Sequence, residues 1–375
     1  MPENAPTSPV ATTGPVKVVG TGLLGASLGL ALRAAGVAVQ LADASPTALA
    51  LARDVGAGTP AADGDPEPVL VVVATPPDVA AETVVAELAR HPRAVVTDVA
   101  SVKALIADEV ARDAGAHLDR YVGSHPMAGR ERSGAAAADA DLFVGRPWVV
   151  VPGPHASPAA VLAVRSLATD VGASPVTLGA QEHDDAVALV SHLPQLAASL
   201  VAARLREAPE AALGLAGQGL RDVTRIAASD PQLWAAILVG NAGPVARALR
   251  EVREDLDTVV TALDRAAQEG PLAPGSTGPL AHVVAAGRSG VGRIPGKHGG
   301  APRRYGEVTV LIPDEPGELG RLFSEVGEAG INIEDLQLEH SAGQPVGLAI
   351  LSVLPSAVEP LEDELDRRGW RVVAR

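Results

Sequence analysis

The chain has 375 residues, a length typical of two or three domains, and 47% of them are hydrophobic, enough to bury a sizeable core. Its net charge of −15 argues against nucleic acid and against anionic membrane surfaces as partners. The chain has no cysteine, which excludes disulfides, thiolate chemistry and cysteine-based metal sites and fits a cytoplasmic protein. No metal site is predicted.

The first 14 residues are rich in Pro and Thr and predict a flexible tail. They lack the basic start and the apolar segment of a signal peptide. The longest early apolar run, VLVVVA at 69–74, is too short to span a bilayer. No association with a membrane is therefore expected.

Residues 16–43 follow the order of a nucleotide-binding unit: strand, glycine loop, helix, strand and acid. The apolar run 16–19 predicts a buried parallel strand. Three glycines in GxGxxG spacing follow it: Gly20, Gly22 and Gly25. These glycines permit a tight turn, let the backbone approach a pyrophosphate and allow close helix packing, with the helix N-terminus facing the phosphates.

Asp43 follows the second predicted strand of this unit, 37–41, where a carboxylate can bond the ribose hydroxyls. An acid at this place repels a 2′-phosphate, so NAD is favoured over NADP as the cofactor. A further strand within 68–77 ends in a proline-rich loop, at the edge where such sheets bind ligands. The predicted cofactor-binding residues are Gly20, Gly22, Leu23, Leu24, Gly25, Asp43, Thr75 and Pro76.

The same alternation continues and predicts a Rossmann-like, doubly wound α/β sheet. Further strands are expected within 94–103, 120–129, 147–153 and 174–179. Ser101 and His125 come at the ends of the first two. Both are therefore expected at the same sheet edge as the glycine loop.

The segment GSHPMAGRERSG, residues 123–134, surrounds a histidine with glycine and proline. Because these residues restrict the backbone, His125 should be held in one place, which suits an acid/base group. Arg130 and Arg132 follow it, and their guanidinium groups would suit a neighbouring anion site.

From about Gln181 the pattern becomes helical and rich in Ala and Leu. Pro194 should kink the first helix, and Ser191 and Gln195 share one of its faces. Arg221 and Arg225 are also four residues apart and could clamp a carboxylate. The segment SDPQLW at 229–234 is typical of a helix start, with Ser229 or Asp230 as the cap.

The last 71 or so residues alternate as strand, helix, strand, strand, helix and short strand, which predicts a βαββαβ ferredoxin-like sandwich. The segments IPDEPGELGRL and GINIEDLQLEH resemble the ACT domain, a sensor that usually binds amino acids. The effector-binding residues implied by that resemblance are Asp314, Pro316, Gly317, Glu318, Leu319 and Asn332.

Five motifs together resemble the prephenate/arogenate dehydrogenase family over residues 16–300: VVGTGLLGASL, TDVASVK, GSHPMAGRERSG, VSHLPQ and RDVTRIAASDPQLW. The resemblance implies an NAD-dependent oxidative decarboxylation of prephenate to 4-hydroxyphenylpyruvate, in tyrosine biosynthesis. It also implies a cytoplasmic homodimer, with tyrosine as the expected effector of the ACT domain. The implied domains are a flexible tail (1–14), an NAD-binding Rossmann-like domain (15–179), an all-helical substrate and dimerisation domain (180–286), a basic linker (287–304) and an ACT regulatory domain (305–375).

The same resemblance assigns roles to individual residues. His125 would be the general base that takes the proton of the ring hydroxyl, and Ser101 would orient it. Arg225 would pair with a substrate carboxylate, and the helical half would interlock two subunits. The remaining substrate-site residues implied are Ser191, Gln195 and Trp234.

Three alternatives stay open at this point. Many members of the family carry a second histidine where this chain has Gln195, so arogenate, with an amino side chain, competes with prephenate as the substrate. Dehydrogenases of the 3-hydroxyacid or imine-reductase kind use a lysine in the helical domain, but no lysine occurs between Lys103 and Lys297. A non-catalytic amino-acid sensor is the third alternative, and the intact glycines, Asp43 and His125 argue against it.

Overall fold

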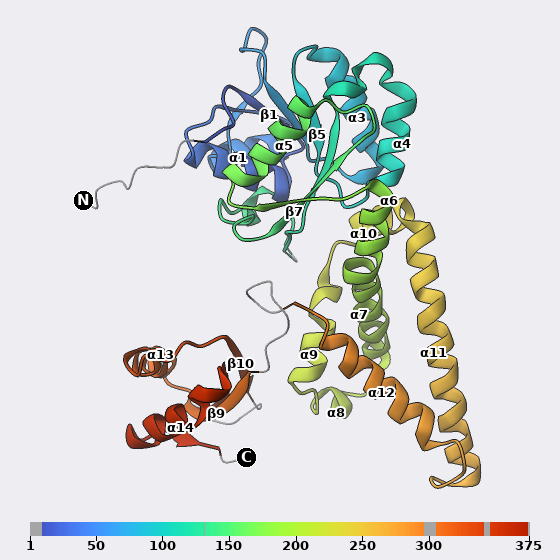
Figure 1. Ribbon diagram of the computed structural model, residues 1–375, viewed down its shortest axis with the longest axis vertical. Coiled ribbons are helices and arrows are strands. Elements are labelled where there is room, and N and C mark those ends of the chain that lie inside the picture. Colours follow the sequence, from blue (N-terminus) through green and yellow to red (C-terminus); the bar gives the residue numbers. More distant parts are fainter. Residues whose placement is uncertain (1–9, 131, 296–304, 341–345, 374–375) are drawn as a thin grey trace. The chain divides into compact units, whose positions relative to one another are not determined.

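The computed structural model describes residues 10–130, 132–295, 305–340 and 346–373 (Figure 1). They form two compact units. The first takes in the described residues up to Arg204 together with Thr224–Glu251, and the second takes in Leu205–Val223 and the described residues from Val252 onward. Parts of the predicted tail and basic linker, and residues 341–345 of the predicted C-terminal sandwich, lie outside the described residues.

The first unit begins with a five-stranded parallel sheet in the order β3-β2-β1-β4-β5. Its strands are β1 (Val16–Val19), β2 (Val39–Ala42), β3 (Thr59–Pro60), β4 (Leu70–Val73) and β5 (Val95–Asp98). Its helices are α1 (Leu23–Ala34), α2 (Pro46–Asp54), α3 (Pro77–Arg90), α4 (Ala104–Asp113) and α5 (Pro158–Asp170).

The sheet is covered on both faces, as expected for parallel strands. Along β4, Leu70 and Val72 pack in one apolar core with α1 and α5, whereas Val71 and Val73 pack in the other with α3 and α4. Figure 1 shows these helix pairs on opposite sides of the sheet. Because successive side chains of a strand point to opposite faces, four consecutive apolar residues supply both cores.

A second sheet continues from the first. It consists of β6 (Val122–Pro126), antiparallel to β7 (Pro147–Pro152), which is parallel to β8 (Ser174–Thr177). A single bridge, Val96 to Tyr121, joins it to β5. The prediction of one continuous sheet is therefore wrong in this detail: the antiparallel turn into β7 leaves two sheets. His125 lies within β6 itself, paired with Val149.

The described end of the predicted flexible tail is held in place. The backbone N–H groups of Ala11 and Thr12 donate to the Asp170 carboxylate at 3.1 and 2.7 Å, and Val10 packs on the core. Asp170 ends α5, so a contact distant in the sequence fixes a segment whose composition predicts mobility.

A long helix follows, interrupted by a π-turn. α6 (Ala180–Val187) passes through the π-turn Ala188–His192 into α7 (Leu193–Arg204). The kink predicted from Pro194 is a widened turn just before the proline, which has no N–H to donate. π-turns inside helices are frequent at functional sites.

Helical segments continue along the chain as α8 (Glu210–Leu213), α9 (Gln218–Thr224), α10 (Pro231–Gly240), α11 (Ala242–Glu269) and α12 (Thr277–Val291). The predicted start of α10 is confirmed, because the Asp230 side chain accepts from the N–H groups of Gln232 and Leu233 at 2.9 Å. α12 ends at Val291, inside the predicted basic linker.

One helix, Ala180–Glu207, has the length and the apolar composition of a membrane span, with a mean hydropathy of 1.6 in its most apolar window. It also carries the buried polar residues His183, Asp184 and His192. A core or interface helix passes the same test of length and composition.

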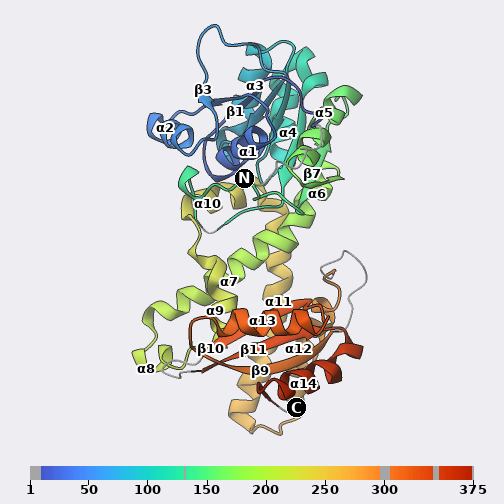
Figure 2. The ribbon, with the colours of Figure 1, turned by 90° about the vertical axis from the view of Figure 1, so that its left-hand side faces the viewer.

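The C-terminal module has the predicted βαββαβ order. Its elements are β9 (Gly306–Pro313), α13 (Glu318–Glu328), β10 (Asp335–His340), β11 (Val346–Val353), α14 (Val358–Arg367) and β12 (Arg371–Val372). They form an antiparallel sheet in the order β10-β11-β9-β12 (Figure 2). Alternate residues of β9 and β11 are buried with apolar residues of both helices, so the helices cover one face of the sheet.

Candidate active site

The loop between β1 and α1 has the geometry of a phosphate-binding turn. Gly20 has a φ of +94°, and a Cβ on it would lie 2.5 Å from the Ala74 carbonyl oxygen. A Cβ on Gly25 would lie 1.9 Å from the Gly20 carbonyl oxygen. Around Gly22 no atom lies within 4 Å of a Cβ position, and α1 begins there without a side-chain cap. The loop therefore leaves open space at a helix N-terminus, as a bound pyrophosphate requires.

Asp43 is attached to this loop. Its Oδ2 accepts from the N–H and from the hydroxyl of Thr21 at 2.6 and 2.7 Å, and its Oδ1 accepts from the Ser45 N–H at 2.8 Å. Thr75 follows β4, and its buried Oγ1 has no hydrogen-bond partner among the described residues. A fixed carboxylate and an unsatisfied hydroxyl near the glycine turn both fit a dinucleotide.

His125 projects from β6 into a buried chain of side chains. Its Nδ1 lies 2.8 Å from His183 Nε2, and His183 Nδ1 lies 2.8 Å from Asp184 Oδ1. The two imidazole rings meet edge to face, with centroids 5.1 Å apart. His125 is only 7% exposed and His183 is fully buried.

Asp184 also caps α4 from the neighbouring helix α6. Its two carboxylate oxygens accept from the N–H groups of Lys103 and Ala104, both at 2.8 Å. Asn241 donates to the Asp184 carbonyl oxygen at 2.8 Å. The carboxylate is therefore held by several donors, which fixes its orientation toward His183.

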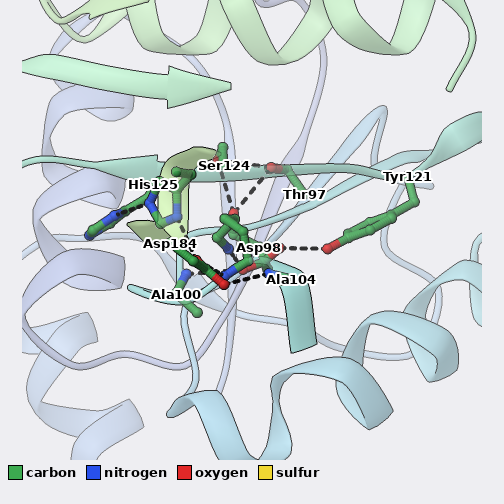
Figure 3. A network of polar contacts seen from close by, with 10 residues as sticks. Thr97, Asp98, Ala100, Ala104, Tyr121, Ser124, His125 and Asp184 are labelled. Carbon is green, nitrogen blue, oxygen red and sulfur yellow. Dashed lines mark hydrogen bonds and ion pairs between the residues drawn. The ribbon is translucent and has the colours of Figure 1, made fainter. Parts of the chain in front are cut away.

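A second buried network lies at the end of β5 (Figure 3). Asp98 forms an ion pair with Lys103 and accepts from the Tyr121 hydroxyl at 2.8 Å. Ser124, next to His125, donates to the Asp98 carbonyl oxygen at 2.9 Å. Figure 3 shows Tyr121 on one side of Asp98 and His125 with Asp184 on the other. This network anchors β6 beside β5 and so holds His125 in place.

Burial sets the electrostatics of the site. It lowers the pKa of His125 well below the ordinary value of 6.5, and the neighbouring His183, Lys103 and His192 contribute in the same direction. Burial also lowers the pKa of Lys103, against the opposing effect of Asp98. Burial further raises the pKa of Tyr121 well above 10, assisted by the Asp98 carboxylate. At neutral pH His125 is therefore an uncharged imidazole, the form that a general base needs.

The expected partner of His125 was Ser101, and here the structure differs. Ser101 is half-buried in the loop between β5 and α4. Within the described part of the chain no hydrogen bond joins it to His125; His183 occupies Nδ1 instead. The order of the strands predicts that Ser101 lies at the same sheet edge as His125. It cannot predict that α6, which follows later in the chain, brings His183 to His125.

The π-turn brings further polar groups into the same unit. Gln195 is buried, and its amide lies 3.4 Å from Ser199 and 3.5 Å from Ser229; Ser191 is half-buried. The His192 ring meets Trp234 edge to face at 6.0 Å, and its Nδ1 lies 3.1 Å from the Asn241 amide. Its buried Nε2 has no partner among the residues described, so this polar atom is available to a ligand or a water.

The predicted arginines occupy different surroundings. Arg225 is exposed and begins the turn Arg225–Ala228 in the first unit, whereas Arg221 lies on α9 in the second unit. Arg130 is half-exposed and forms an ion pair with Asp139, so a structural partner already holds it.

Three of the six predicted effector residues line a separate small pocket of about 130 Å³ in the C-terminal module. Asp314, Gly317 and Leu319 line it, and Gly317 has the left-handed φ of +98° that favours glycine. Glu318 instead pairs with Arg321, and Asn332 donates to Glu334 at 2.8 Å. Pro316 is exposed in the same loop.

Sequence reasoning missed His183, Asp184, His192 and Asn241 as site residues. The available signal was the run EHDD at 182–185, four consecutive polar residues of which the middle two, His183 and Asp184, are buried. Polar residues on the buried face of a helix need hydrogen-bond partners. Here His183 contacts His125, and Asp184 accepts from the first backbone N–H groups of α4.

The chain is similar in sequence to known dehydrogenases. The prephenate dehydrogenase nucleotide-binding domain matches residues 28–177, and the prephenate dehydrogenase dimerization domain matches residues 179–273. A probable prephenate dehydrogenase of Streptomyces niveus, NovF, is 39% identical over 358 residues, which cover 94% of this chain and 98% of that protein.

Two solved structures are similar over about three quarters of the chain. One is a prephenate dehydrogenase of Aquifex aeolicus with hydroxyphenyl propionate and NAD+ (TM-score 0.63, 26% identity, covering 74% of this chain and 98% of that one). The other is a Synechocystis arogenate dehydrogenase (TM-score 0.58, 26% identity, covering 74% and 99%). With both family domains matched in sequence order, the chain belongs to the prephenate dehydrogenase family.

Proposed function

We propose that the chain is an NAD-dependent prephenate dehydrogenase, which forms 4-hydroxyphenylpyruvate by oxidative decarboxylation. The observation that carries this proposal is His125: a buried, neutral imidazole with one nitrogen committed to His183, in a chain of the prephenate dehydrogenase family. The Aquifex aeolicus relative binds NAD+ and hydroxyphenyl propionate, which supports both the cofactor and the substrate class.

His125 acts as the general base. With Nδ1 occupied, Nε2 accepts the proton of the ring hydroxyl as the carbon–hydrogen bond breaks. NAD, when held by the glycine turn, would supply the hydride acceptor, and loss of the ring carboxylate as CO₂ would make the ring aromatic. A neutral, buried imidazole is suited to this step because it needs no deprotonation before it can accept the substrate proton.

The glycine turn would hold the cofactor. Gly20 and Gly25 let the turn pack against the backbone of Ala74 and of Gly20 itself, and the open space at Gly22 would receive the pyrophosphate. Asp43, held by Thr21, would bond the ribose and disfavour NADP. The remaining proposed cofactor contacts are Leu23, Leu24, Thr75 and Pro76.

The substrate carries two carboxylates, and the chain offers polar groups for them. We assign Arg225 to one carboxylate, where a charge-assisted hydrogen bond contributes about 1.5–3 kcal/mol. Ser191, Gln195 and Trp234 would line the pocket, and Ser101 would bond the ring hydroxyl. The unsatisfied Nε2 of His192 supports a polar ligand in this region.

Arogenate is the second candidate substrate. Gln195 supplies an uncharged amide that can bond either a keto or an amino side chain, and a Synechocystis arogenate dehydrogenase has the same fold. NADH formation at saturating NAD, with prephenate and arogenate in parallel and NADP as the control, tests both. The proposal expects prephenate to be turned over with NAD. Turnover of arogenate alone would transfer the function to the second candidate, and turnover of neither would refute both.

We also propose that the protein is a cytoplasmic homodimer. The matched dimerization domain supports it, as do large apolar side chains on the exposed surface of the long helix and α10: Leu189, Val190, Leu200, Val201 and Val239. A second copy of the chain would cover this surface.

The C-terminal module is proposed to be an ACT domain that binds tyrosine. The ferredoxin-like topology and the pocket lined by Asp314, Gly317 and Leu319 support this assignment. Tyrosine should then inhibit the enzyme, and Asp314→Ala should weaken the inhibition while leaving uninhibited turnover unchanged. Undiminished inhibition of that variant would place the tyrosine site elsewhere.

A further inference from the structure

His125, His183 and Asp184 form a linear chain of hydrogen bonds with two contacts of 2.8 Å. His183 and Asp184 are 0% and 2% exposed, and they come from the helix α6, on which His183 lies 58 residues after His125 in the sequence. Their burial and alignment point to a role exerted through His125.

The donors in this chain can be assigned from the acceptors. The Asp184 carboxylate already accepts from the Lys103 and Ala104 N–H groups, and an ionised carboxylate only accepts. The proton between Asp184 and His183 therefore resides on His183 Nδ1. A neutral His183 then has a lone pair on Nε2, which must accept from His125 Nδ1–H. The consequence is that His125 Nε2 carries a lone pair.

We propose that His183 and Asp184 are positioning residues that hold His125 in the tautomer with Nε2 free and stabilise the imidazolium formed when His125 takes the substrate proton. This inference rests on the proposed function for the role of His125 as base. An aspartate that orients a catalytic imidazole and stabilises its charged form works in the same way in serine proteases.

The surrounding charges make this support necessary. Lys103 faces His125 as a cation paired with Asp98, and the third nearby imidazole, His192, is itself buried. Lys103 and His192 offer no negative charge to an imidazolium at His125, and the Asp98 carboxylate is already paired with Lys103. Asp184, acting through His183, is the carboxylate connected to it by hydrogen bonds.

The first test reads the tautomer directly in the wild-type chain. The protein has only nine histidines, so ¹⁵N-histidine labelling gives a tractable nitrogen spectrum, with His125→Asn used to assign the His125 signals. We expect His125 to be protonated at Nδ1 and unprotonated at Nε2 at neutral pH. A proton on Nε2 would overturn the proposal. Because this experiment needs no substrate, it stands even if prephenate is not turned over.

The second test compares His183→Leu with His183→Gln. The glutamine amide can accept from His125 and donate to Asp184, whereas leucine does neither. We expect leucine to lower kcat at least about 100-fold with KM for prephenate and NAD nearly unchanged, and glutamine to recover a large part of that loss. We also expect the acid limb of the kcat profile to move to lower pH in the leucine variant. Equal kcat in the two variants, or a change confined to KM, would contradict the proposal.

Discussion

Among single residues, His125 has the most direct expected effect on turnover. Replacing it with asparagine removes the nitrogen that accepts the substrate proton but leaves the glycine turn and Asp43 untouched. We expect His125→Asn to bind NAD as the wild type does and to lose about 10²–10⁴-fold in kcat. Cofactor titration and steady-state kinetics on the same preparation measure both. Near-normal kcat would remove His125 from the mechanism.

The pH profile follows from the state of the same residue. The base must be neutral, so kcat/KM should fall as the pH drops through the pKa of His125. Burial lowers that pKa well below 6.5, so the fall should begin at lower pH than for an exposed histidine. A kcat/KM profile between pH 4 and 8 tests this. Loss of activity already at pH 7 on the acid side would contradict the buried environment described here.

His192 links the same site to folding stability. Burial lowers its pKa from 6.5 to about 4, so between these values the unfolded chain binds a proton that the folded chain does not. The contribution of neutral His192 to the free energy of unfolding is therefore fully present above pH 6.5 and is lost as the pH falls toward 4. Between pH 7 and pH 5 the difference amounts to about 2 kcal/mol.

Denaturant unfolding at these two pH values, with His192→Gln as the control, measures this contribution. Glutamine does not titrate, so the variant should lose about 2 kcal/mol less than the wild type on acidification. The same loss in both proteins would show that other groups are responsible.

At the scale of elements, the start of α10 offers a matched pair of variants. Asp230 accepts from two backbone N–H groups of the first turn at 2.9 Å, and Pro231 occupies the first helical position. Asp230→Ala should lower the free energy of unfolding by about 0.5–2 kcal/mol, and Asp230→Asn, which keeps an acceptor oxygen, by less. Equal losses would show that the cap is not the source of the effect.

Local patterns predicted many of these elements, because the physics that forms them is local. The run 16–19 and the GxGxxG spacing were enough to predict β1 and the turn into α1. The segment SDPQLW was enough to predict the start of α10. The βαββαβ order of the C-terminal module followed from alternation and turn residues in the same way.

The contacts that complete the site could not be read in this way. The partner of His125 lies 58 residues away, on the helix α6, which is followed by the π-turn Ala188–His192. Pro194 signals an irregularity but not whether the turn before it is widened or merely bent. The sequence predicts Ser101 as the residue that orients His125, but it does not predict the hydrogen bond between His125 and His183.

For the whole molecule, the two family domains and the C-terminal module combine a dehydrogenase with a module of ferredoxin-like topology. The relative from Streptomyces niveus aligns over 94% of the chain, whereas the two solved structures cover 74% of it. The C-terminal module is thus shared along the aligned length with the Streptomyces niveus relative, and the two solved structures resemble mainly the rest of the chain.

The most direct test of the central claim is the stoichiometry of the reaction of the wild-type chain with prephenate and NAD. NADH absorbance, released CO₂ and 4-hydroxyphenylpyruvate are measured in one reaction carried to completion. Oxidative decarboxylation predicts equimolar amounts of all three. NADH without CO₂, or the absence of NADH with both prephenate and arogenate, would contradict it.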